Sequence, residues 1–183
     1  MNFECILDII CLIGTIILLY SFTFKVSNFF DIKKIFIDHF KIFNGNYLQL
    51  FSVYITPIFI ALNIALKQQV TKDTLEGINL IITVLTSMFF AIISILCSVD
   101  FKQKKEKYKK LVEETFNSTL FEIICCLLLL FASFILIFIN KYDNTYLLKF
   151  ASTFIYYLLM IVILNIFIIL KRIKTVFDKN LNE

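Results

Sequence analysis

Long apolar runs separated by short polar segments dominate the hydropathy pattern of the chain. Each run is about 20 residues long, the length that spans a bilayer. The five runs lie at 5–24, 47–66, 78–98, 120–139 and 148–170. They lack the alternation of a membrane β-strand, so each predicts a helix. The pattern predicts an all-α integral membrane protein, a single polytopic domain over 1–183 with an N-terminal span and two helical hairpins.

Two segments between the runs predict amphipathic helices. Residues 28–44 carry Phe and Ile at spacings of three and four, with Asp and Lys on another face. Ser27 or Asn28 can cap the start of this helix and Gly45 can end it. An aromatic face opposite a lysine-bearing face is typical of a helix lying in the membrane interface. The segment 101–119 repeats the pattern, with an apolar stripe of Tyr108, Leu111, Val112, Thr115 and Phe116.

The distribution of basic residues predicts the orientation. Fourteen of the eighteen Lys and Arg residues fall in 25–41, 101–119 and the C-terminal segment, and four fall in the other connections. Short basic segments stay on the cytoplasmic side. We therefore expect the N-terminus outside, the C-terminus in the cytoplasm, and 101–119 as a basic cytoplasmic loop or helix.

Composition agrees with this picture and narrows the source. Mean hydropathy is +0.86, 60% of residues are hydrophobic and 17% are charged. No soluble domain of 183 residues has an interior for five such runs. The richness in Ile, Phe, Lys and Asn is what an AT-rich genome produces, so the expected location is a bacterial inner membrane.

Motifs of enzymes and cofactor sites are missing from the sequence. It contains no HExxH, no Gly-x-Ser-x-Gly and no glycine-rich phosphate loop. His39 is the single histidine, Arg172 is the single arginine, and Cys125 and Cys126 are adjacent, so they point to different helix faces. We predict no catalytic residue, no metal site and no cofactor.

Three polar residues within the runs are candidate functional residues. Glu122 lies just inside the fourth run, and an intramembrane acid suggests function. The alternative is a solvated position at interface depth or pairing with a lysine. Asn63 and Asn165 lie deeper, and together with Asn79, Thr83, Thr86 and Ser87 they line either a polar path or helix–helix contacts. Pro57 predicts a bend in the second run, at a gate or at a packing contact.

The lysines of the basic segment are candidate contacts for anionic lipid or for an acidic cytoplasmic partner. They are Lys104, Lys105, Lys107, Lys109 and Lys110. The alternative is that these lysines only set the orientation. Direct nucleic-acid binding is not expected, because Asp100, Glu106, Glu113 and Glu114 are interspersed.

The stretch "FKQKKEKYKKLVEETFNSTLFEI", a lysine-rich segment leading into an apolar run, resembles the membrane subunit of the Kiwa antiphage system. That resemblance implies a homo-oligomeric membrane sensor that recruits a cytoplasmic effector. We expect a non-catalytic protein that self-associates in the bilayer and couples a membrane event to a cytoplasmic partner. The alternatives are a transporter or channel component and a bacteriocin-immunity-like accessory protein.

Overall fold

A computed structural model describes residues 13, 32–43, 45–99, 106–139 and 145–182. Within these ranges the regular structure is entirely α-helical, which confirms the all-α prediction for the described part of the chain. The helices are α2 (Ile32–Lys41), α3 (Tyr47–Tyr54), α4 (Thr56–Lys67), α5 (Lys72–Cys97), α6 (Glu106–Ile139) and α7 (Thr145–Asn182). The predicted span at 5–24 lies outside the described residues, except for Ile13.

Within the described residues, four helical segments are long enough and apolar enough to cross a membrane. They are Tyr47–Lys67, which joins α3 and α4, then Lys72–Cys97, Glu106–Ile137 and Leu148–Lys179. Large apolar side chains on their outer faces are strongly exposed, with Leu48 at 84%, Leu80 at 70% and Phe150 at 76%. Water would make such surfaces costly, whereas lipid chains solvate them.

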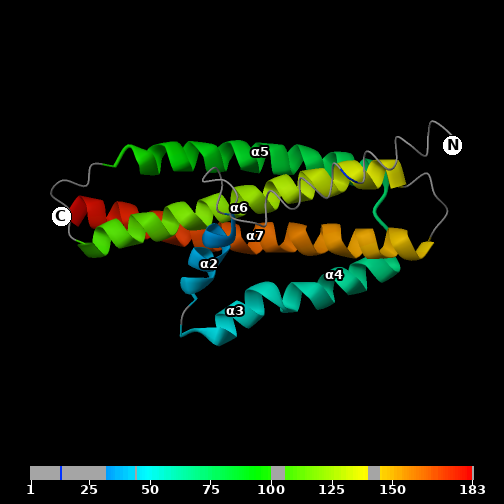
Figure 1. Cartoon of the computed structure of the whole chain (residues 1–183), viewed down its shortest axis with the longest axis horizontal. Coiled ribbons are helices and arrows are strands. Elements are labelled where there is room, and N and C mark those ends of the chain that lie inside the picture. The colour runs from blue at the N-terminus through cyan, green and yellow to red at the C-terminus, as the bar shows by residue number, and fades with distance from the viewer. Residues whose placement is uncertain (1–12, 14–31, 44, 100–105, 140–144, 183) are drawn as a thin grey trace.

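The long helices pack as antiparallel neighbours. Helix α6 packs against α5 and α7, and α4 packs against α7 (Figure 1). The shared core draws on Phe89 of α5, Leu129 and Leu136 of α6, and Val162 of α7, all of them fully buried. Their alternating directions bring the start of α6 and the end of α7 to the same end of the bundle.

Local sequence signals account for the helix ends. Thr71 caps α5 by accepting the amide of Thr74. Pro57 lies in the first turn of α4, just after the junction of α3 and α4 at Ile55, so the predicted bend is present. Gly45 follows α2 with φ of +92°, a left-handed conformation that favours glycine.

Helix α2 runs across the direction of α6 and packs against it (Figure 1). Its described part, Ile32–Lys41, falls within the predicted amphipathic segment 28–44, and residues 28–31 and 44 are outside the described ranges. Phe36 meets Phe121 of α6 edge-on, with ring centroids 4.9 Å apart. Contact with the bundle therefore covers one aromatic face of this short helix.

Helix α6 differs from the prediction in its continuity. The sequence predicts a basic segment at 101–119 followed by a span at 120–139, but one uninterrupted helix covers both from Glu106 onward. The junction holds weak helix formers, Asn117, Ser118 and Thr119, but no Gly or Pro interrupts it. The hydroxyls of Ser118 and Thr119 donate to carbonyls one turn earlier in the same helix. The predicted stripe is confirmed, because Tyr108, Val112 and Thr115 are buried.

Candidate functional site: a buried polar chain beside a basic extension

The centre of the candidate site is a carboxyl–amide pair inside the bundle. Glu122 of α6 is 0% exposed and Asn165 of α7 is 1% exposed. The Nδ2 atom of Asn165 donates to Oε2 of Glu122 over 3.0 Å. Burial without a partner would be costly for both groups, so this hydrogen bond fixes the register of α6 against α7.

Two further side chains extend this pair toward α2. The hydroxyl of Tyr54, at the end of α3, donates to Oδ1 of Asn165 over a long 3.5 Å. On its other side, the same hydroxyl is bonded to Nε2 of His39. Four side chains from four helices therefore form one chain of hydrogen bonds: His39, Tyr54, Asn165 and Glu122. We call it the buried polar chain.

Donor and acceptor roles in the buried polar chain follow from one another. Because the amide group of Asn165 donates to Glu122, its oxygen faces Tyr54 and accepts. The hydroxyl of Tyr54 then donates its single hydrogen to Asn165 and accepts from His39, whose Nε2 must carry the hydrogen. The opposite nitrogen, Nδ1 of His39, is buried without a hydrogen-bond partner among the described residues. The chain thus has a defined direction that requires a hydrogen on Nε2 of His39.

Aromatic rings surround His39 and reinforce its neutral state. The imidazole stacks on Phe121 with centroids 3.9 Å apart and an interplanar angle of 5°. Phe43 and Tyr54 meet it edge-on. Burial among these rings, together with the nearby charge of Arg172, lowers the pKa of His39 from 6.5 to about 4. His39 is therefore neutral at physiological pH.

An ion pair forms a second link between α6 and α7. Arg172 donates to Glu114 over 3.0 Å, and both side chains are partly buried. Glu114 lies about two turns before Glu122, and Arg172 lies about two turns after Asn165. The two links therefore occupy successive levels along the same helix pair.

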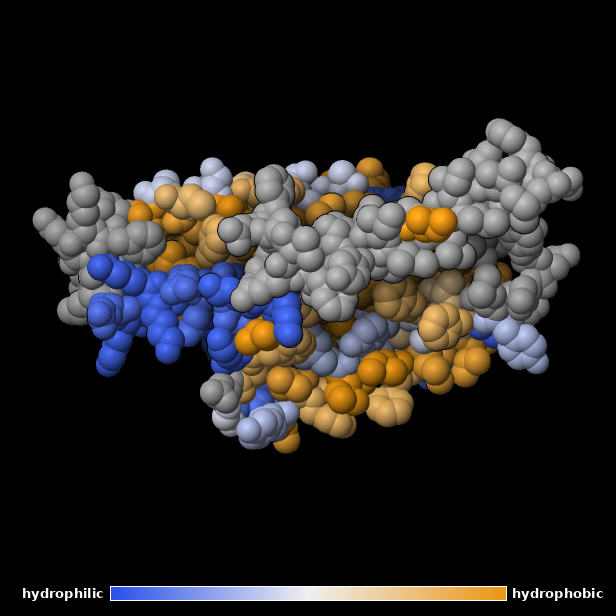
Figure 2. All heavy atoms as spheres, in the orientation of Figure 1, coloured by the Kyte–Doolittle hydropathy of each residue, from blue (hydrophilic) through white to orange (hydrophobic). Residues whose placement is uncertain are grey.

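Beyond the ion pair, α6 and α7 carry most of the exposed lysines. We call residues 106–119 and 171–182 the basic extension. Its exposed lysines are Lys107, Lys109, Lys110, Lys171, Lys174 and Lys179. Figure 2 shows hydrophilic atoms gathered at this end and apolar atoms along the rest of the bundle. Lys104 and Lys105 lie outside the described residues.

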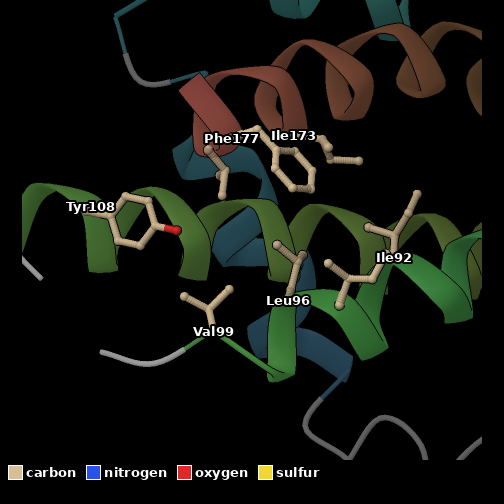
Figure 3. A pocket seen from close by; sticks show the side chains of 8 residues that line it. Ile92, Leu96, Val99, Tyr108, Ile173 and Phe177 are labelled. Atoms are coloured by element: carbon tan, nitrogen blue, oxygen red, sulfur yellow. The ribbon is translucent and has the colours of Figure 1, made fainter. Parts of the chain in front are cut away.

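The basic extension has its own small apolar core. Leu96, Tyr108, Val112 and Val176 pack together where α5 ends, α6 starts and α7 nears its end. A pocket of about 50 Å³ lies there between α5, α6 and α7, lined by residues that include Ile92, Val99 and Phe177 (Figure 3). The lysines therefore sit on a packed helical scaffold.

The structure separates the three candidate intramembrane residues. Glu122 and Asn165 meet in the buried polar chain, whereas Asn63 is exposed on α4. The alternative of a solvated or lysine-paired Glu122 is wrong, because the side chain is fully buried and bonded to Asn165.

Of the α5 hydroxyls, Thr86 matches the predicted helix–helix contact, because it also bonds Cys126 of α6. Thr83, Thr86 and Ser87 each donate to a carbonyl one turn earlier in their own helix. Asn79 is half-buried, and its Oδ1 has no hydrogen-bond partner among the described residues. These hydrogen bonds therefore form no path across the bundle.

Sequence reasoning missed His39 and Tyr54 as members of the site. A signal for His39 exists, because Ile32, Phe36, His39 and Phe43 recur at the spacing of one helix face. A histidine in the middle of an apolar face is placed for burial. Tyr54 gives no such signal, since its partners come from other helices.

Among the described residues, no group of three or more His, Cys, Asp and Glu side chains is placed to hold a metal ion. Comparison with known proteins finds no matching family model, no similar curated protein and no similar solved structure. The function must therefore be inferred from the arrangement itself, in which a buried polar chain lies inside a helical bundle that carries a basic extension.

Proposed function

We propose that the protein is a non-catalytic, multi-pass protein of the bacterial inner membrane that couples an event in the bilayer to a cytoplasmic partner. The N-terminus is outside, and the basic extension is in the cytoplasm. The chain acts as a homo-oligomer, and its resemblance to the Kiwa membrane subunit extends the proposal to antiphage defence.

The continuity of α6 and α7 carries this proposal. Each helix passes without a break from the apolar bundle into the basic extension. The Glu114–Arg172 ion pair ties the two helices where the extension begins. A change in tilt of either helix within the bilayer must therefore move the lysines, because an unbroken helix transmits displacement along its axis.

Topology is the first test. Alkaline phosphatase fused after Lys105 should be inactive, and the same enzyme fused at Lys72 should be active. The opposite pattern would place the basic extension outside the cell and overturn the proposal.

Transmission along the helices is the second test. Spin labels at Lys109 and Lys174, introduced as cysteines in a background without the native ones, report the separation of the two helices in the extension. Bilayers of short and long acyl chains change helix tilt through hydrophobic mismatch. We expect the distance distribution to shift between these bilayers. A matched pair on α6 alone, at Glu106 and Glu113, should keep one distribution, and an unchanged Lys109–Lys174 distance would contradict coupling.

The Glu122–Asn165 pair favours a second candidate, a transporter or channel component. A buried acid in a membrane bundle is typical of proton or ion pathways. Proteoliposomes with an internal pH dye distinguish the two candidates. A pH gradient dissipated by the wild type but not by Glu122→Gln would support transport, and equal retention of the gradient would support coupling.

A further inference from the structure

His39 is the one buried polar side chain of the described part of α2. Phe36 of this helix and Phe43, which follows it, contact the bundle through apolar surface. The outward face carries the exposed Lys33 and Lys34. His39 therefore provides a directional contact between this short helix and the bundle, through the hydroxyl of Tyr54.

A proton on His39 is incompatible with the buried polar chain in two ways. It places a second N–H at Nδ1, which faces no acceptor among the described residues. It also places a full positive charge inside the bundle, away from water and near Arg172. Burial of that charge is unfavourable, which is why the pKa of His39 falls to about 4.

Charged and titratable groups on every neighbouring helix bear on this proton. They are Lys33, Lys34, Asp38 and Lys41 of α2, Tyr54 of α3, Glu114, Glu122 and Cys125 of α6, and Tyr157 and Arg172 of α7. The two carboxyl groups named on α6 are engaged elsewhere: Glu114 holds Arg172, and Glu122 accepts from Asn165. Asp38 pairs with Lys41 over 2.8 Å. None of the three is a hydrogen-bond partner of His39.

We propose that His39 is a proton-binding site that controls the docking of α2: the neutral imidazole fastens the helix to the bundle, and the protonated imidazole releases it. The released helix keeps its lysines and aromatic residues, so it remains at the membrane surface. Proton binding thus selects between a docked and an undocked amphipathic helix. This inference goes beyond the proposed function, since it concerns α2 and holds whatever the basic extension binds.

Hydrogen exchange of the full-length protein in lipid nanodiscs measures docking directly. Amides of 32–43 in the wild type are compared with those of His39→Gln at each pH, so that the intrinsic pH dependence of exchange cancels. Gln retains a donor for Tyr54 and cannot be protonated. We expect the docking equilibrium of the wild type to fall roughly 30-fold between pH 7.5 and pH 5, and that of His39→Gln to stay constant.

Two matched variants keep this proposal falsifiable. Asp38→Asn removes the exposed ion pair with Lys41 and leaves the chain intact, so it should respond to pH as the wild type does. Tyr54→Phe removes the hydroxyl that His39 bonds and should raise exchange in α2 at pH 7.5. A pH response that persists in His39→Gln, or disappears in Asp38→Asn, would overturn the assignment to His39. Unchanged exchange in Tyr54→Phe would show that the hydrogen-bonded chain does not fasten α2.

Discussion

The buried polar chain and the basic extension place polar groups on the same two helices but satisfy them differently. Glu122 and Asn165 are fully buried and depend on partners from other helices. Lys107, Lys109 and Lys110 are exposed, so water can solvate them without a partner from another helix. Loss of a partner should therefore cost folding free energy in the chain, whereas loss of charge in the extension should leave stability unchanged and alter what binds there.

Acidification should produce the largest effect on the chain. The folded-state pKa of His39, about 4, lies below its ordinary value of 6.5, so the unfolded chain binds the proton more tightly. Above pH 6.5 the imidazole is neutral in both the folded and the unfolded chain, so its burial does not lower stability. As pH falls from 6.5 toward 4, the free energy of unfolding of the wild type should fall by up to about 3 kcal/mol. If the free energy of docking α2 is smaller than this, the loss stops at that value. Chemical unfolding in detergent, relative to His39→Gln at each pH, measures this difference.

Removal of Asn165 should give the next largest effect. Asn165→Ala leaves the buried Glu122 without its amide donor and leaves Tyr54 without its acceptor. We expect a loss of about 2 kcal/mol in the free energy of unfolding. Asn63→Ala is the matched control, because Asn63 is an exposed amide on α4, and it should change stability by less than about 0.5 kcal/mol. Equal losses in both variants would show that burial does not distinguish the two asparagines.

The same contrast explains what could be predicted from sequence. Hydropathy located the long helices, and helical spacing located the stripe from Tyr108 to Phe116, because both signals are local. The pairing of Glu122 with Asn165 joins residues far apart in the chain, so no periodicity reveals it. Glu122 and Asn165 were both candidates, but their pairing emerges only when α6 and α7 pack.

Tyr54→Phe should lower stability by less than Asn165→Ala does. The substitution keeps the ring, which packs against Phe40 and Phe43, and deletes only the hydroxyl between His39 and Asn165. Interhelical hydrogen bonds in membrane proteins contribute modestly, so we expect a loss of about 1 kcal/mol. Tyr47→Phe, at a position 79% exposed, is the control and should have no effect on thermal stability in detergent.

The lysines of the basic extension should have the smallest effect on stability. Gln at Lys107, Lys109 and Lys110 removes three charges without removing a buried contact, so we expect a change below about 0.5 kcal/mol. The same variant should lose enrichment of anionic lipid around the extension, since each lysine contributes about 1 kcal/mol near an anionic surface.

Copurified phospholipid, quantified by mass spectrometry, measures that enrichment, and the phosphatase fusions verify that orientation is retained. Glu122→Gln is the matched comparison from the chain, because it alters a polar side chain that is fully buried. It should weaken stability and leave the anionic lipid content unchanged. The reverse outcome, stable lipid content in the lysine variant and lost lipid in Glu122→Gln, would mean that the two regions are not independent and that the chain controls the surface of the extension.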